Sequence, residues 1–346
     1  MMPERRRLWA LDGLRGLAAL AVVAYHYLHR GPHLYSELGP SHPWFVWGQY
    51  GVQLFFIISG FVIFDSVRGT ASGPFFANRA IRLYPAYWVA VIITFTVVAV
   101  FGLPGRQTTL PVGLFNLTML EGFFNVPYVD GAYWTLAVEL SFYVVIGLLA
   151  RSRALSDRWL FVTLFAWLAV DLGVRAAHFL TPGNPVTEIL GGIAYWMPMF
   201  LVGIALNIGH KTGRWLLPVL VIVAAFCVIA PGDLSVVPVL IVATFLTLGA
   251  LYVKLPDRVR PVSNYLGELS YPVYLVHQNV GYVILLALAA WRVPQLGAVA
   301  VAAVVAIAIA TAISYGFDLP VRRRMRAVVA ARFGRTGKDP RDALNP

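Results

Sequence analysis

Long apolar runs separated by short polar segments are the dominant pattern of this chain. Runs of roughly 17–25 apolar residues have the length at which a helix crosses a bilayer. The pattern therefore predicts an all-α, polytopic membrane protein, a bundle of about ten transmembrane helices. The predicted spans cover residues 8–29, 48–66, 83–103, 132–150, 158–180, 188–208, 215–230, 236–253, 265–290 and 298–318.

The positions of the basic residues support an even number of spans. If both termini are cytoplasmic, 22 of the 27 Lys and Arg residues fall in cytoplasmic segments, four fall outside, and Arg15 lies within the membrane. Cytoplasmic loops of membrane proteins carry such an excess of positive charge. We therefore expect cytoplasmic N- and C-termini and a multi-pass location in the cell membrane.

Composition narrows the class of protein further. Hydrophobic residues make up 59% of the chain, and the formal net charge is +11. Because the positive charge lies in short loops and in the C-terminal tail, it favours contact with membrane lipid and gives no support for nucleic acid as a partner. The sequence predicts a transmembrane domain over residues 1–320 and a basic cytoplasmic tail over 321–346. The one cysteine, Cys227, excludes an intrachain disulfide.

Ionisable residues inside the first span indicate a functional site. Arg15 and His26 are eleven positions apart, so they share one face of a helix and lie about 16 Å apart along its axis. Asp12 falls near the same face. Such groups are costly in lipid and almost always face a bundle interior or a water-filled cavity.

Two further spans carry ionisable residues at a similar predicted depth. Glu139 is expected about two turns below the outer surface, close to the level of His26. A carboxylate beside an imidazole would orient the ring and raise its basicity, as in a catalytic pair. The alternative is a buried pair that only fixes helix packing. His277 either lines the same cavity or is a packing residue.

Arg79 and Arg82 lie one turn apart at the predicted cytoplasmic start of the span 83–103. Two guanidinium groups on one face near a helix N-terminus form a receptor for phosphate. The alternative is the ordinary positive charge of a cytoplasmic loop. The histidine spacing matches no metal site, so we expect no metal.

Five segments combine into a family resemblance. In order along the chain they are LDGLRGLAALAVVAYH, GVQLFFIISGFVIF, NRAIRLYPAYW, YWTLAVELSFY and LGELSYPVYLVHQ. Together they resemble the acyltransferase-3 family of bacterial membrane acyltransferases, over about residues 8–324. The resemblance implies a ten-helix enzyme that moves acyl groups, usually acetyl, from cytoplasmic acyl-CoA to hydroxyl groups of glycans, glycolipids or macrolides.

The resemblance also implies roles for individual residues. His26 is similar to the essential histidine of the family and Arg15 to its partner, while Arg79 and Arg82 match an arginine motif that serves acyl-CoA binding. Glu139 matches the glutamate that follows a Trp-x-Leu stretch. We further expect contact with substrate from Asp12, Gln53, Tyr133, Trp134 and His277. The chain departs from the family pattern at Gln53, where many members are acidic, and at 318–320, where Asp-Leu-Pro replaces Glu-Arg-Pro.

These features lead to one hypothesis with alternatives. His26, oriented by Glu139, would act as general base on a hydroxyl of a glycan or small-molecule acceptor, with acetyl-CoA or another acyl-CoA as donor, bound by Arg15, Arg79 and Arg82. An acyl-histidine relay would use the same residues. Two alternative functions use no acyl transfer: a proton-coupled transporter of a small amphipathic solute, and a non-catalytic scaffold.

The oligomeric state is a separate expectation. Span faces rich in Gly and Ala would also allow a homodimer.

Overall fold

A computed structural model describes residues 8–68, 70–230 and 234–333, most of which are helical. Those residues contain no β-strand, so the all-α class is confirmed. The α-helices are α1 (Trp9–Tyr25), α2 (Gly31–Leu34), α3 (Gly51–Arg68), α4 (Ser72–Phe101), α5 (Leu110–Asn116), α6 (Trp134–Arg151), α7 (Leu160–Leu180), α8 (Pro185–Ala194), α9 (Met197–Thr212), α10 (Leu216–Ile229), α11 (Val236–Tyr252), α12 (Arg260–Ala290), α13 (Gln295–Thr311) and α14 (Leu319–Phe333). Two π-helices, η1 (His26–Arg30) and η5 (Ala312–Asp318), continue α1 and α13, and short 3-10 helices form η2 (Ser36–Leu38), η3 (Pro43–Tyr50) and η4 (Glu121–Phe123).

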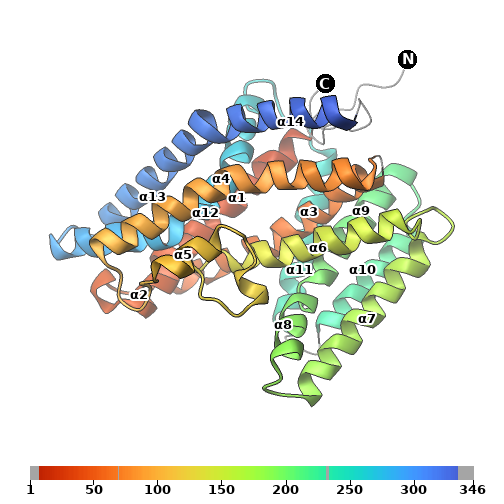
Figure 1. Ribbon diagram of the computed structural model, residues 1–346, viewed down its shortest axis with the longest axis horizontal. Helices are drawn as coiled ribbons and strands as arrows, with labels where there is room; N and C mark the ends of the chain where they lie inside the picture. Colours follow the sequence, from red (N-terminus) through yellow and green to blue (C-terminus); the bar gives the residue numbers. More distant parts are fainter. Residues whose placement is uncertain (1–7, 69, 231–233, 334–346) are drawn as a thin grey trace.

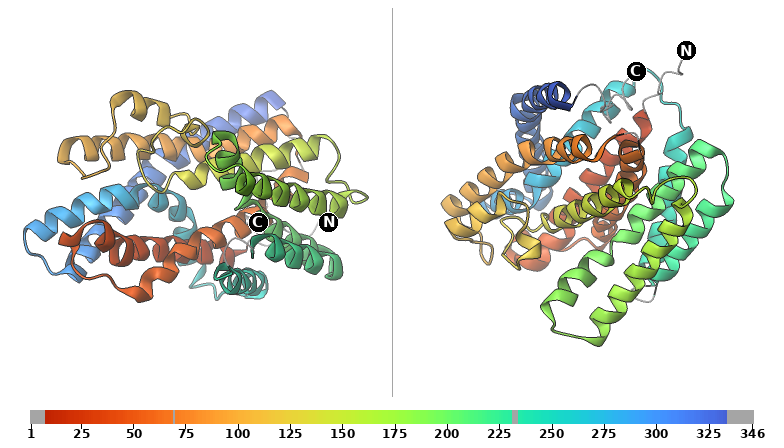
Figure 2. Two further views of the ribbon diagram at one scale, coloured as in Figure 1. Left: turned by 90° about the horizontal axis from the view of Figure 1, so that it is seen from below. Right: turned by 45° about the vertical axis from the view of Figure 1, so that its right-hand side comes forward.

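The helices form two groups with a third between them. Figures 1 and 2 show α1, α4, α12, α13 and α14 gathered on one side and α7, α8 and α10 on the other, with α3, α6 and α9 between them.

Each apolar run forms helix, but two runs differ from their predicted shape. The run 188–208 is divided at Tyr195–Trp196 into α8 and α9. Helix α4 begins at Ser72, well before residue 83, so Arg79 and Arg82 lie two turns inside the helix. The prediction that they sit at a helix N-terminus is therefore wrong. Their backbone amides are used within the helix, and only their side chains are available to an anion.

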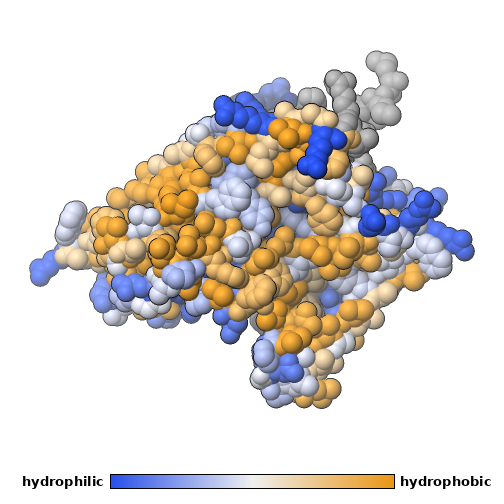
Figure 3. Space-filling model, in the orientation of Figure 1, coloured by the Kyte–Doolittle hydropathy of each residue, from blue (hydrophilic) through white to orange (hydrophobic). Residues whose placement is uncertain are grey.

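The helices have the properties of a multi-pass membrane protein. Among the described residues, seven helical segments are long and apolar enough to cross a membrane, and α10 and α11 are shorter apolar helices. The predicted count of about ten spans is not confirmed by this criterion. In Figure 3, hydrophobic residues cover the middle of the visible face, and strongly hydrophilic ones gather over α14 and around the turn between α6 and α7. The cytoplasmic location of the termini stays a prediction.

Helix α1 and its continuation η1 pack closely along α12. A Cβ atom at Gly16 would lie 2.4 Å from Cβ of Leu266, and one at Gly281 would lie 2.1 Å from Oη of Tyr27. Only glycine permits backbones to approach so closely, as in other membrane helix pairs. The contact brings η1, the continuation of α1, against the middle of α12.

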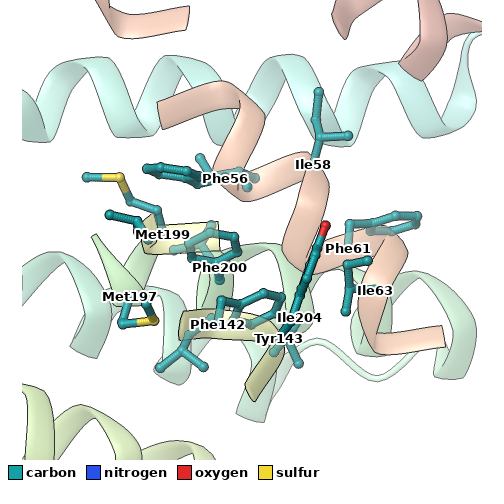
Figure 4. Close-up of a cluster of buried hydrophobic side chains, with 14 of the residues drawn as sticks. Phe56, Ile58, Phe61, Ile63, Phe142, Tyr143, Met197, Met199, Phe200 and Ile204 are labelled. Carbon is teal, nitrogen blue, oxygen red and sulfur yellow. The ribbon is translucent and has the colours of Figure 1, made fainter. Parts of the chain in front are cut away.

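An aromatic core fixes α6 between α3 and α9 (Figure 4). The buried ring of Phe200 stacks on Phe56 at a centroid distance of 4.7 Å and on Phe142 at 4.1 Å. Such large buried aromatic surfaces dominate core packing. Tyr143 follows Phe142, and its ring stands at the edge of this cluster with the hydroxyl toward α3. The packing thus sets the direction of the polar face of α6.

The expected division at residue 320 has no counterpart in the described structure. Helix α14 continues from η5 and packs against α4 (Figure 1). Its Arg322 side chain is 1% exposed. The described part of the predicted tail is therefore a component of the bundle, and residues 334–346 lie outside the described residues.

Candidate functional site: an arginine-lined cavity and a histidine pair

A large cavity opens among α1, α3, α4, α6, α12 and α14. Its empty volume, with the opening included, is about 1280 Å³. Most of its charged lining is basic. The lining includes the arginines Arg15, Arg79, Arg82, Arg322 and Arg326 and the carboxylates Asp12, Glu139 and Glu268. Five guanidinium groups against three carboxylates make this cavity a site for an anionic ligand.

Neighbouring aromatic rings hold the two arginines of α4 against the cavity wall. The guanidinium of Arg79 lies 5.8 Å from the ring centroid of Tyr143, and that of Arg82 lies 5.4 Å from the ring of Tyr271. Cation–π contacts of this kind orient a guanidinium without using its N–H groups. Nε of Arg79 and Nη1 of Arg82 are buried, with no hydrogen-bond partner among the described residues. Buried donors of this type are costly unless a ligand binds them.

Glu139 belongs to this cavity. It accepts hydrogen bonds from Ser59, at 3.3 Å, and from Tyr143. It also attracts Arg15 and Arg79 electrostatically. The expected pair with His26 is therefore wrong: α6 turns Glu139 toward the arginines instead. Its carboxylate holds two of the arginines in place.

His26 instead pairs with His277 of α12. The His277 Nε2 atom lies 3.1 Å from His26 Nδ1, and the ring centroids are 4.8 Å apart at a steep angle. His277 is fully buried, whereas His26 is only half-buried. His26 is also the first residue of the π-helix η1, a type of distortion that is frequent at functional sites.

Two backbone carbonyls determine where the protons of this pair lie. His26 Nδ1 is 2.9 Å from the oxygen of Val22, and His277 Nδ1 is 2.8 Å from the oxygen of Tyr274. A carbonyl oxygen only accepts, so both Nδ1 atoms carry the proton. His277 Nε2 then has a lone pair, and the single Nδ1–H of His26 is shared between this lone pair and the Val22 oxygen. The remaining His26 nitrogen, Nε2, therefore carries a lone pair that can act as a base.

A thin apolar layer separates the histidine pair from the cavity. Val52, Phe55 and Tyr274 line the top of the cavity and pack against Val22 and Ala132. The Tyr274 hydroxyl is held by Thr135, at 3.0 Å, and its ring lies 5.6 Å from that of His277. The cavity and the half-buried His26 are thus neighbours, because Tyr274 both lines the cavity and contacts His277, the partner of His26.

The structure assembles some of the predicted site residues and separates others. Asp12, Arg15, Arg79, Arg82 and Glu139 meet in the cavity. The other five do not line it: His26 and His277 form their own pair, Gln53 is buried in α3, Tyr133 packs on Tyr87, and Trp134 packs on Trp196. Sequence reasoning missed Tyr143, Glu268, Tyr271, Arg322 and Arg326 of the lining. No group of three metal-binding side chains occurs among the described residues.

The outer segment 117–133 is anchored by two buried carboxylates. Asp130 accepts a hydrogen bond from the backbone N–H of Asn279 at 2.9 Å, two residues from His277. Glu121 accepts one from Tyr87 at 3.0 Å. Burial raises the pKa of Asp130 to about 6 and that of Glu121 to about 7. Asp130 thereby joins this segment to α12 beside the histidine pair.

Apolar helices that enclose buried ionisable groups are features of a multi-pass membrane protein, and the comparison of sequences identifies its family. A family model described as an acyltransferase domain matches residues 8–316, so the chain belongs to this family. The acyltransferase-3 resemblance is thereby confirmed.

Several relatives in bacteria are similar over most of their length. Acyltransferase MdmB of Streptomyces mycarofaciens is 28% identical, over 80% of this chain and 80% of its own. Nodulation protein 10 of Rhizobium leguminosarum bv. viciae is 29% identical, over 84% and 89%. Exopolysaccharide production protein ExoZ of Rhizobium meliloti is 30% identical, over 67% and 76%. No solved structure matches the chain.

Proposed function

We propose that this chain is a membrane O-acyltransferase that moves an acyl group, in the first instance acetyl, from acyl-CoA to a hydroxyl group. The observation that carries the proposal is the contact of His26 with His277 next to an arginine-lined cavity. Family membership supports the reaction type. The donor and the histidine chemistry are parts of the proposal.

The donor's phosphates would bind in the cavity. Arg79 and Arg82 offer buried N–H groups that lack partners among the described residues. Arginine binds phosphate through strong, charge-assisted hydrogen bonds. Arg15 lies about 16 Å along α1 from His26. The pantetheine arm of CoA, extended from the arginines, would carry the thioester toward the apolar layer and His26.

His26 would act as a general base. Its Nε2 takes the proton from the acceptor hydroxyl as that oxygen attacks the thioester carbonyl. The C–S bond breaks, the ester forms, and the CoA thiolate leaves and receives the proton from His26. General-base catalysis typically contributes 10²–10⁴-fold in rate. His277 accepts from Nδ1–H throughout and so stabilises the imidazolium that forms.

The half-buried position of His26 favours an acceptor that arrives from the outer side. Beside it, η3 presents Trp44 and Trp47, which are 85% and 62% exposed. Flat aromatic side chains of this kind pack against sugar rings and macrocycles. The relatives' names include a peptidoglycan O-acetyltransferase, OatA of Listeria monocytogenes. A hydroxyl-bearing glycan or small molecule is therefore the acceptor class we propose.

The test uses purified protein in nanodiscs. Wild type is expected to bind acetyl-CoA and to hydrolyse it slowly without acceptor. His26→Gln should bind acetyl-CoA equally well but lose at least 100-fold in hydrolysis. His33→Gln changes an exposed histidine of α2, which follows η1 directly, and is the matched control.

Two outcomes would contradict the proposal. Hydrolysis by His26→Gln at the rate of the control would remove His26 from the chemistry. Failure of wild type to bind acetyl-CoA or longer acyl-CoAs would remove the donor. Proton-coupled transport, which consumes no acyl-CoA, would then be the better account of the buried His, Glu and Arg groups.

A further inference from the structure

Helix α14 presents two of its arginines to the cavity and two to the surface. Arg322 and Arg326 are four residues apart, so they share one face, and both line the cavity. Arg323 and Arg324 are exposed on the other side. A helix that only anchored the protein to lipid headgroups would have no reason to bury arginine on its inner face.

Arg322 fixes the position of α14. It forms ion pairs with Asp318 and with Glu268, the latter at 4.0 Å, and its side chain is almost fully buried. Asp318 and Glu268 also attract Arg82 of α4 electrostatically. This network joins α12, α14 and α4, so the inner face of α14 keeps its orientation toward the cavity.

Arg326 extends the basic wall by one helical turn. It is half-buried and lies on the same cavity as Arg79 and Arg82. A donor such as CoA carries a pyrophosphate and a 3′-phosphate, whose charge two arginines alone would balance only in part. A third guanidinium at the same cavity improves the electrostatic match with such a ligand.

We propose that Arg326 of α14 binds a phosphate of the acyl-CoA donor together with Arg79 and Arg82. The proposal rests on the function proposed above. It makes the C-terminal helix a part of the donor site, and it accounts for arginine rather than an apolar residue on that inner face. Arg322 is a positioning residue that holds α14 through its ion pairs.

The experiment compares single charge removals on one helix. We measure the KM for acetyl-CoA, in the slow hydrolysis assay, of Arg326→Gln and of the controls Arg323→Gln and Arg324→Gln. Arg326→Gln is expected to raise the KM about tenfold or more with a small change in kcat. It should weaken inhibition by adenosine 3′,5′-bisphosphate, which has phosphates but no thioester arm, by a similar factor. Arg326→Lys, which keeps the charge, should recover part of the loss.

Three results would overturn the proposal. One is a KM for Arg326→Gln equal to that of the exposed-arginine controls. Another is a lower kcat with unchanged KM and unchanged bisphosphate inhibition. The third is an effect seen in nanodiscs with phosphatidylglycerol and absent in those of phosphatidylcholine alone, which would assign Arg326 to lipid headgroups. If Arg326→Gln does not fold, Arg326→Met is compared with Arg326→Lys: weaker bisphosphate inhibition in the Met variant than in the Lys variant supports a charge role, and equal inhibition in the two overturns it.

The same assay distinguishes the role proposed for Arg326 from the proposed use of acyl-CoA as donor. If Arg79→Gln raises the KM and Arg326→Gln does not, acyl-CoA is the donor but α14 does not bind it. If wild type itself does not bind acetyl-CoA, the function proposed above fails.

Discussion

At the scale of single residues, backbone carbonyls decide the chemistry of the histidine pair. Val22 and Tyr274 each accept from an Nδ1–H group, so the tautomers of His26 and His277 are set by the helices on which they lie. In the proposed mechanism, the neutral imidazole of His277 would take the place that a carboxylate has in many catalytic pairs. A buried carboxylate beside His26 would have added an uncompensated charge to the membrane interior.

His277 should therefore act by accepting one hydrogen bond. His277→Leu is expected to lower kcat about 10–100-fold with little change in the KM for acetyl-CoA, because His26 loses the partner that orients it. His277→Gln, whose amide oxygen can accept from Nδ1–H, should recover a large part of the activity. Equal losses in the two variants, measured by steady-state kinetics, would assign His277 to packing alone.

Glu121 should make stability depend on pH. Burial raises its pKa in the folded protein from 4.5 to about 7, so the folded state favours the protonated carboxyl. The associated stability is present below about pH 4.5 and is lost as the pH rises through 7. Glu121→Gln should match wild type in thermal midpoint at pH 5 and exceed it at pH 8. Identical pH profiles for the two proteins would contradict this, and Glu37→Gln, at an exposed site, is the control.

The sequence predicted which side of a helix carries a residue more reliably than it predicted which residue that side chain contacts. The eleven-residue spacing put Arg15 and His26 on one side of α1, and Arg15 indeed faces the cavity. Depth along α6 could not place Glu139, because its rotation depends on the aromatic core around Phe200. The carbonyl contacts of His26 and His277 depend on the packing of α1 on α12, which no local pattern reports.

At the scale of elements, the pairing of α1 with α12 brings the reactive groups together. The two helices touch through glycines, and the histidine pair lies at the outer part of this contact. The apolar runs predicted these helices well. They could not predict that α14 returns to the bundle, because its basic composition resembles that of an ordinary cytoplasmic tail.

A single methyl group should disturb this contact. Gly16→Ala places a Cβ atom 2.9 Å from backbone atoms of Leu266, which cannot move as a side chain would. We expect a lower thermal midpoint and a severalfold loss of kcat as the helices separate. Gly249→Ala, a helical glycine with nothing within 4 Å, should leave both unchanged or raise the midpoint slightly. Equal midpoints for the two variants in the same detergent would contradict the close-packing argument.

At the scale of the whole molecule, the two halves of the proposed reaction lie at different levels of the bundle. The arginines approach the predicted cytoplasmic side, and His26 with the aromatic segment η3 approaches the predicted outer side. The distribution of Lys and Arg predicts this orientation from the sequence alone. The separate positions of the arginine-lined cavity and the histidine pair could not be predicted. They depend on the packing of five side chains that lie far apart in the sequence: Val22, Val52, Phe55, Ala132 and Tyr274.

Labelling of introduced cysteines tests the orientation. In a Cys227→Ser background, a membrane-impermeant maleimide added to spheroplasts should label Trp44→Cys and spare Arg323→Cys. Inverted vesicles should give the reverse pattern. Both side chains are exposed, so access to the reagent depends on sidedness. Labelling of Arg323→Cys in intact spheroplasts would invert the topology.

The apolar layer between cavity and histidine pair has a consequence for the energetics of the cell. A membrane that stores a proton gradient loses it through any continuous file of water molecules. Val22, Ala132 and Tyr274 pack together beside the ionisable groups, and apolar packing of this kind opposes such a file. It would let the protein keep ionisable groups deep in the bilayer and still limit proton leakage while no donor arm passes through it.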